Sequence, residues 1–125
     1  MAAACPCGSG VPFADCCRPL LRGEREATTA QALMRSRYTA FVRRDAGYLL
    51  RTWVPQTRPG SVETGGVTWL GLEVLDTTSG QAADATGTVT FVAHFDEGSG
   101  PQTLRETSTF RRIDGRWYYV EGVHS

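Results

Sequence analysis

Residues 104–121, LRETSTFRRIDGRWYYVE, decide the fold class of this chain of 125 residues. They contain two runs rich in β-branched and aromatic residues, and the dipeptide Asp114-Gly115 separates the two runs. Asp-Gly is typical of a two-residue hairpin turn, which would place Ile113 opposite Arg116. The stretch therefore predicts an antiparallel hairpin near the end of the chain.

The sequence before this hairpin changes from a helical pattern to a strand pattern. Apolar residues recur at three- and four-residue steps after Thr28 and Thr29, either of which can cap a helix that continues to about Arg43. Asp45 can cap a second, short helix that Pro55 stops. Helices followed by an antiparallel meander indicate an α+β fold, with N-terminal helices packed on one face of a curved sheet. We expect strands near residues 67–77, 86–96, 103–113 and 116–123, and a linker or first turn over residues 18–27.

The hairpin register predicts which side chains face the helices. Counting back from the turn gives the pairs Phe110–Tyr119, Ser108–Glu121 and Glu106–Val123, whose side chains share one side of the sheet. Because this side carries aromatic residues, it should face the helices. Two carboxylates, Glu106 and Glu121, would then lie diagonally on the concave side, roughly 7–8 Å apart. Strand 86–96 supplies a matching inner face of Val89, Phe91, Ala93 and Phe95.

Carboxylates inside a fold need a partner or a proton. Arg37 lies on the inner stripe of the first helix and could bridge the two with its forked donors. One reading is a buried network that fixes the helix on the sheet. The other is a pocket that binds a small polar ligand or transfers a proton. The candidate pocket residues are Arg37, Glu106, Ser108, Tyr119 and Glu121.

No residue is assigned a catalytic role from the sequence. By strand parity His94 faces away from the inner face, and His124 belongs to a polar tail. The chain contains no Ser-His-Asp or Cys-His arrangement and no glycine-rich phosphate loop. We therefore favour a protein that is not an enzyme, without settling the point.

The four cysteines of the chain all lie near its start, at Cys5, Cys7, Cys16 and Cys17. A Cys-x-Cys pair, eight residues and two adjacent cysteines bring four thiolates together once the loop with Gly8 and Gly10 folds back. Zinc binds four such sulfurs in closed tetrahedral sites, which leave no position for water or substrate. We therefore expect one structural zinc ion, with Ser9 offering a hydroxyl donor to a sulfur.

Two other readings of the cysteines stay open. Cys16 and Cys17 would form a strained ring with each other, but cross-pairing with Cys5 and Cys7 into two disulfides is geometrically allowed. A redox dithiol is the third reading. The first residues, MAAA, lack the charged and apolar regions of a secretory signal, so we expect a cytoplasmic protein. Thiols stay reduced in the cytosol, which favours the metal site.

The segment CPCGSG at residues 5–10, with eight residues between the second and third cysteines, resembles the SEC-C zinc motif. Three further segments, MRSRYTAFV at 34–42, YLLRTW at 48–53 and residues 104–120, are similar to the bacterial YchJ family. The resemblance implies an N-terminal SEC-C motif followed by a nuclear-transport-factor-2-like (cystatin-like) cone, in a family whose role is uncharacterised. We accordingly expect a zinc-binding module over residues 1–23 and an α+β domain over residues 24–125.

Composition narrows the range of functions. Thirteen basic and thirteen acidic residues give a net charge of zero, unlike the positive surface of a typical nucleic-acid binder. No apolar run approaches the length of a membrane span. We expect a non-enzymatic adaptor whose zinc module contacts a protein partner, while the cone domain supplies a second surface or a homodimer face. The alternative is a small-molecule binder or an enzyme that uses the cone pocket.

Overall fold

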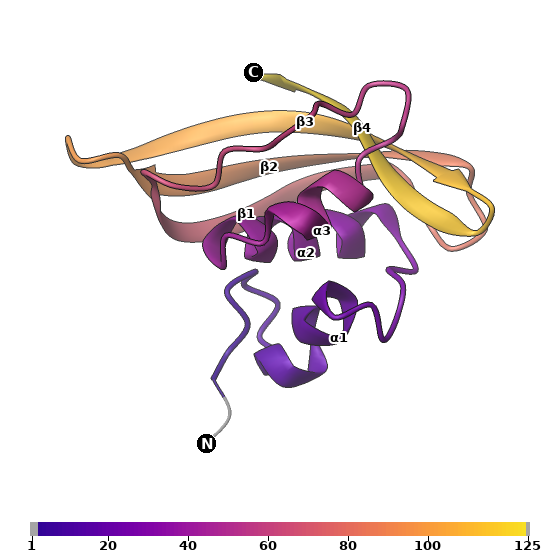
Figure 1. Cartoon of the computed structure of the whole chain (residues 1–125), viewed down its shortest axis with the longest axis horizontal. Coiled ribbons are helices and arrows are strands. Elements are labelled where there is room, and N and C mark those ends of the chain that lie inside the picture. The colour runs from indigo at the N-terminus through magenta and orange to yellow at the C-terminus, as the bar shows by residue number, and fades with distance from the viewer. Residues whose placement is uncertain (1–2, 125) are drawn as a thin grey trace.

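The computed structural model describes residues 3–124, which fold into three layers (Figure 1). The first layer is an antiparallel sheet in the order β1-β2-β3-β4, and helices α2 and α3 cover one of its faces. The N-terminal segment, with a short 3-10 helix and α1, lies on the far side of α2. The expected α+β fold is confirmed. The elements are η1 (Phe13–Asp15), α1 (Cys17–Leu21), α2 (Ala30–Val42), α3 (Ala46–Arg51), β1 (Thr68–Ser79), β2 (Thr86–Asp96), β3 (Pro101–Ile113) and β4 (Arg116–His124).

The two helices that cover the sheet begin at the expected caps. The Thr29 side chain accepts a hydrogen bond from the backbone N–H of Ala32, at 3.0 Å. The Asp45 side chain accepts one from Tyr48, also at 3.0 Å. Both contacts satisfy amide groups that a helix start leaves unpaired. Within the described residues, none of the helices has both the length and the apolar character needed to cross a membrane.

The stretch expected to be a linker, residues 18–27, is partly helical. Helix α1 begins at Cys17, and its Leu20 is buried against the core. A helix of five residues makes little more than one turn, which is too short for an apolar period to be recognised. The expectation for residues 18–21 was therefore wrong.

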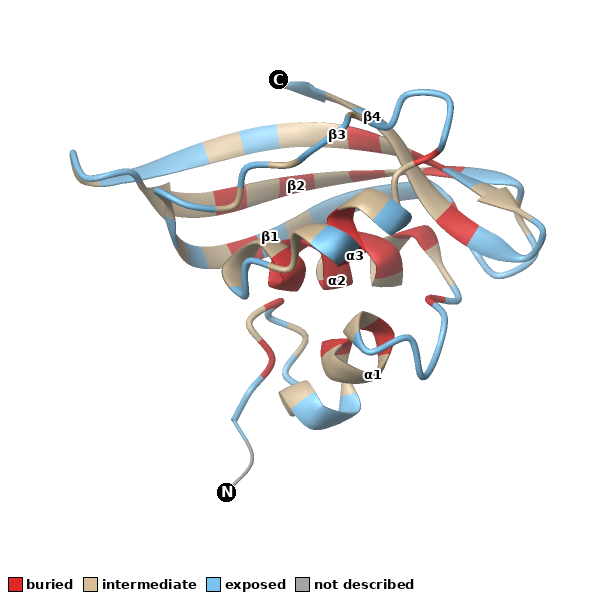
Figure 2. Ribbon diagram, viewed as in Figure 1, coloured by how far each residue is buried: buried red, intermediate tan, exposed pale blue. Residues whose placement is uncertain are grey.

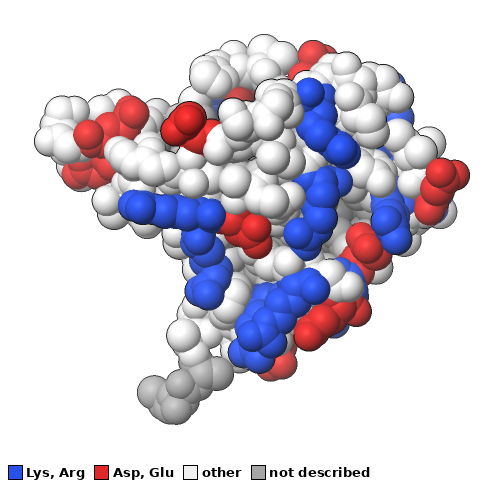
Figure 3. Space-filling model, in the orientation of Figure 1, with Lys and Arg blue, Asp and Glu red and all other residues white. Residues whose placement is uncertain are grey.

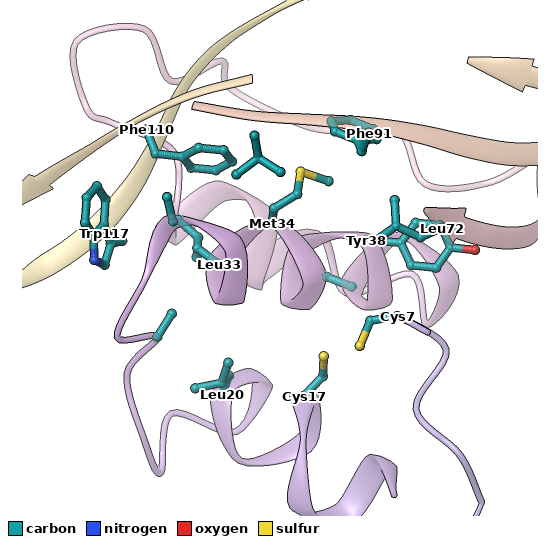
Figure 4. Packing of buried hydrophobic residues seen from close by; sticks show 14 of the residues in the cluster. Cys7, Cys17, Leu20, Leu33, Met34, Tyr38, Leu72, Phe91, Phe110 and Trp117 are labelled. Atoms are coloured by element: carbon teal, nitrogen blue, oxygen red, sulfur yellow. The ribbon is translucent and has the colours of Figure 1, made fainter. Parts of the chain in front are cut away.

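Helix α2 is buried on two faces, as its many red segments show (Figure 2). One face carries large side chains, including Leu33, Met34 and Tyr38, which pack below the sheet near Phe91 (Figure 4). The other face carries small residues, among them Thr39 and Ala40, both fully buried. The helix is therefore the central layer, with the sheet above and the cysteine-bearing segment below.

Strand β4 contains a β-bulge that alters the expected register. The turn and the pair Phe110–Tyr119 are as predicted, but Thr109 pairs with Glu121, so Val120 is the extra residue. The segment after α3 runs beside β4 at this point: Val54 donates to the Tyr119 carbonyl and Tyr119 donates to Thr52, both at 2.8 Å. One inserted residue moves every later side chain to the opposite face.

Candidate functional site

Four thiols form a compact cluster between the N-terminal segment and α2. The sulfur atoms of Cys5, Cys7, Cys16 and Cys17 all lie within 4.8 Å of one another. The Cys7–Cys16 and Cys16–Cys17 sulfur distances are 3.7 and 3.9 Å. Four sulfurs at about 2.3 Å from one zinc ion would be about 3.8 Å apart in a tetrahedron. The cluster could therefore hold a metal ion with little rearrangement.

A tight hairpin brings the first cysteine pair to the second. The Cys5 amide donates to the Val11 carbonyl at 3.0 Å, which closes a loop between them. Gly8 and Gly10 have positive φ angles of 78° and 82°, a conformation that favours glycine. Cys16 and Cys17 follow at the start of α1. The expected roles of both glycines agree with this geometry.

The thiols share protons in a way that prepares them for a metal ion. A hydrogen bond from Cys17 holds the pKa of Cys7 at about 4, well below its usual value. The same bond raises the pKa of Cys17, and burial raises that of Cys16. The lowered pKa favours a thiolate at Cys7, whereas the raised pKa values of Cys16 and Cys17 favour their protonated thiols. A bound cation would replace those protons, because thiolates are the ligands of zinc.

Groups from outside the cluster support the sulfurs. Ser9 Oγ lies 3.1 Å from Cys16 Sγ, as expected from the motif. Two residues of α2 were not expected. The Thr39 hydroxyl, fully buried, donates to Cys17 Sγ at 3.3 Å and lies 3.7 Å from Cys5 Sγ. Arg35 Nη1 donates to the Cys7 carbonyl at 2.6 Å. The cone domain therefore helps to build the cysteine site.

The second candidate site is a cavity of about 220 Å³ between α2 and the sheet. Six aromatic side chains form much of its wall, and its polar groups come from three other residues and from the tyrosines and tryptophans. Of the candidate pocket residues, Arg37, Glu106, Ser108 and Tyr119 line this cavity. The lining residues are Met34, Arg37, Tyr38, Phe41, Trp53, Trp69, Phe91, Ala93, Leu104, Glu106, Ser108 and Tyr119.

Arg37 is buried, but it does not bridge glutamates as the sequence suggested. Its Nη1 donates to the Leu49 carbonyl at 2.8 Å and to Thr52 Oγ1 at 2.7 Å, at the end of α3. The guanidinium carbon lies 4.4 Å from the centre of the Tyr119 ring and 5.5 Å from that of Trp53. Burial lowers the pKa of Arg37 to about 10, so the side chain stays charged at neutral pH.

Glu106 lines the cavity, and its side chain is 16% exposed. Ser108 donates a hydrogen bond to Oε2 at 3.1 Å, and His124 Nε2 lies 3.2 Å from Oε1. Gly122 faces the carboxylate, and a Cβ atom there would lie only 2.5 Å from Glu106 Cδ. His124 and Gly122 were missed because the bulge at Val120 decides which residues oppose Glu106.

Glu121 does not belong to the cavity. It is exposed and opposite Thr109, on the other face of the sheet, because the bulge reverses the alternation after Tyr119. The expected pair of carboxylates is therefore absent, and Glu106 is the one carboxylate among the described lining residues. His94 also lies away from the cavity, 2.7 Å from Glu73, as strand parity predicted.

Comparisons with known proteins match both parts of the chain. Residues 29–122 match the family described as "YchJ, middle NTF2-like domain", and residues 1–19 match the SEC-C motif. A UPF0225 protein of Streptomyces coelicolor is 51% identical over 119 residues, which cover 94% of this chain and 93% of the relative. One from Chromobacterium violaceum is 49% identical over 125 residues, covering 97% and 93%.

Two solved structures have the same architecture. The solution structure of a SEC-C motif containing protein from Rhodopseudomonas palustris has a TM-score of 0.86 at 36% identity, covering 100% of this chain and 99% of the other. The crystal structure of a SEC-C motif containing protein from Psychrobacter arcticus has a TM-score of 0.80 at 28% identity, covering 97% and 82%. With a family match over most of its length and relatives near 50% identity, the chain belongs to the YchJ-like family of UPF0225 proteins, with an N-terminal SEC-C motif.

Proposed function

We propose that this protein binds a small molecule with a mainly apolar body in the cavity of its cone domain. The observation that carries the proposal is the cavity itself, about 220 Å³ in volume and walled by aromatic side chains. Ligand sites are commonly preformed, largely apolar concavities with a few placed polar groups. Arg37, Glu106 and Ser108 are polar groups of this kind.

The cysteine cluster has a structural role in this proposal. The sulfur spacing suits one zinc ion, and four protein thiolates would fill its tetrahedron. No coordination position would then be left for a substrate. The site requires reduced thiols, which is consistent with a cytoplasmic protein. We expect one zinc ion per chain in elemental analysis of the purified protein.

Indole is a suitable probe of the cavity because it is compact and largely apolar. We expect its binding to shift the amide resonances of cavity residues in an NMR titration. Leu104→Trp fills the cavity from β3 and should abolish binding, since Leu104 lines the wall. Thr103→Trp is the matched control, because the neighbouring Thr103 is exposed on the outer face. Equal binding by both variants, or shifts confined to the outer face, would contradict the proposal.

An adaptor role is the second candidate, and a basic hollow beside the zinc module favours it. The hollow has a volume of about 420 Å³ and is lined by four arginines and one aspartate, together with Phe13 and Leu21. Figure 3 shows basic side chains over the helical half of the drawn face, with acidic side chains beside them. Such a surface suits an acidic segment of a partner protein. The charged residues of the hollow are Arg18, Arg22, Arg43, Arg44 and Asp45.

A short glutamate-rich peptide can test this second candidate. We expect the peptide to bind the zinc-loaded protein, and Arg18→Gln with Arg22→Gln to weaken binding at low salt. Arg111→Gln with Arg105→Gln, on the strand β3, is the control pair because those arginines lie outside the hollow. Equal binding by both double variants would argue against an adaptor surface here.

A further inference from the structure

Two opposite charges line the cone cavity without touching each other. Arg37 is only 4% exposed, and Glu106, whose side chain is 16% exposed, lines the same cavity. Among residues 3–124, the ion pairs within 4.0 Å do not include Arg37. Buried opposite charges attract strongly in a medium of low dielectric constant. Other contacts must therefore hold the Arg37 guanidinium and the Glu106 carboxylate apart.

Arg37 is held on the helical side. Its Nη1 donates hydrogen bonds to the Leu49 carbonyl and to Thr52 Oγ1. The guanidinium lies over the Tyr119 ring. A guanidinium has five N–H donors in a fixed fork, and these contacts use the two on Nη1. The donors on Nε and Nη2 make no hydrogen bond to the described residues. They remain for a ligand, because Arg37 lines the cavity.

Glu106 is held on the sheet side. Ser108 and His124 contact one oxygen each, and Gly122 leaves the space that the carboxylate fills. An ionised carboxylate can accept about four hydrogen bonds, so roughly two positions are still free. The cavity thus presents hydrogen-bond acceptors on Glu106 and donors on Arg37, and aromatic rings line much of the rest of its wall.

Resting on the proposed cavity function, we propose that the ligand is a neutral, planar nitrogen heterocycle with an N–H donor for Glu106 and a carbonyl oxygen for Arg37. The aromatic walls suit a flat ring that can stack on them. One positive and one negative group give the cavity no net charge, so an ionic ligand would be attracted by one group and repelled by the other. A ring without polar edges would leave both charged groups without new partners.

Three fused bicyclic rings of similar size separate these requirements. Quinolin-2(1H)-one carries an N–H beside a carbonyl, quinoline carries only an acceptor, and indole only a donor. We expect quinolin-2(1H)-one to bind at least tenfold more tightly than either of the others, measured by NMR titration at one pH and salt concentration. The similar size of the three rings keeps differences in the apolar contribution small.

Substitutions test whether Glu106 accepts the hydrogen bond from the N–H group of the ligand. Glu106→Gln should lower the affinity for quinolin-2(1H)-one about tenfold and change the affinity for quinoline by less than about twofold, because only the charged acceptor is lost. Glu121→Gln is the control, since this exposed glutamate lies on the other face of the same hairpin. Gly122→Ala is a second route, because its Cβ would push the Glu106 carboxylate aside while leaving its charge in place. This variant should also lower the affinity for quinolin-2(1H)-one while leaving the affinity for quinoline nearly unchanged.

The outcomes separate this inference from the function on which it rests. If all three rings bind in the cavity with equal affinity, the cavity is a ligand site but the heterocycle inference is overturned. The same holds if Glu106→Gln and Glu121→Gln bind quinolin-2(1H)-one equally. If none of the rings binds, both the inference and the cavity function fall.

Discussion

Thr39 is the residue that joins the cysteine cluster to the cone domain. Its hydroxyl is fully buried and contacts Cys17 and Cys5, whereas every cysteine comes from the N-terminal segment. A donor to a metal-bound thiolate reduces the charge on sulfur and fixes its orientation. The metal affinity of this cluster should therefore depend on a residue that lies twenty-two positions after the last cysteine.

Replacing this hydroxyl tests the dependence. Thr39→Val has nearly the same shape but cannot donate, so we expect zinc affinity to fall about 10–100-fold, as for other supporting groups of metal sites. Competition with a chromophoric chelator measures the change. Thr39→Ser keeps the hydroxyl, so its zinc affinity should be close to that of the natural protein. Equal affinities for the valine and serine variants would show that the hydroxyl does not support the site.

The limits of sequence reasoning also become visible at single residues. The cysteine spacing and the Asp114-Gly115 turn act locally, so the cluster and the pairing of Phe110 with Tyr119 could be predicted. The bulge at Val120 lies where the segment after α3 forms hydrogen bonds with the edge of β4 at Tyr119. No local pattern reports a contact between residues so far apart in sequence. The prediction failed beyond that residue, and Glu121 was placed on the wrong face.

Helix α2 shows the same contrast at the scale of an element. Its large apolar residues recur at helical spacing, so the face that packs on the sheet was predictable. Its second face carries small residues such as Ser36, Thr39 and Ala40, all fully buried. Small side chains give a weak hydrophobic signal, and Arg35 adds a charge to the same face. The layer below α2 was therefore not predictable from the pattern of this helix.

The β1–β2 turn fixes the start of this helix through two glycines. The Gly80 carbonyl accepts the Ala30 amide at 2.9 Å, and a Cβ on Gly87 would lie 2.4 Å from Gly80 Cα. Gly87→Ala must move backbone, so we expect a loss of about 1–3 kcal/mol in the free energy of unfolding. Gly47→Ala in α3 is the control, because its nearest atom lies at 3.6 Å. Urea unfolding that gives the same stability for both would contradict this packing.

At the scale of the whole molecule, the two parts matched by separate families share one core. Cys7, Cys17 and Leu20 belong to the same buried cluster as Tyr38, Phe110 and Trp117 (Figure 4). The contributions to stability nevertheless differ between the layers. The sheet is held by long antiparallel ladders, whereas the N-terminal segment has only helices of three and five residues. Helices this short are not stable by themselves in water.

Metal removal should therefore affect the layers unequally. We expect chelation to lower Tm, since an ion that binds only the folded state stabilises it by RT ln(1 + [L]/Kd). Hydrogen exchange should then show amides of residues 5–21 losing protection, while those of β2 and β3 keep it. Cys16→Ser should reproduce this pattern without chelator. His94→Ala, which changes a histidine on the outer face, should not.

This pattern follows from where the bonds lie. Without the ion, the N-terminal segment keeps the Thr39 and Arg35 contacts and little else of a polar kind to α2, whereas β2 is paired along its full length on both edges. Protection that is lost evenly across residues 5–21 and both central strands would mean that the ion holds the entire fold. The division into a zinc module at 1–23 and a cone domain at 24–125 would then be untenable. Restored protection on adding back zinc would show that the loss reflects the metal rather than oxidation of the thiols.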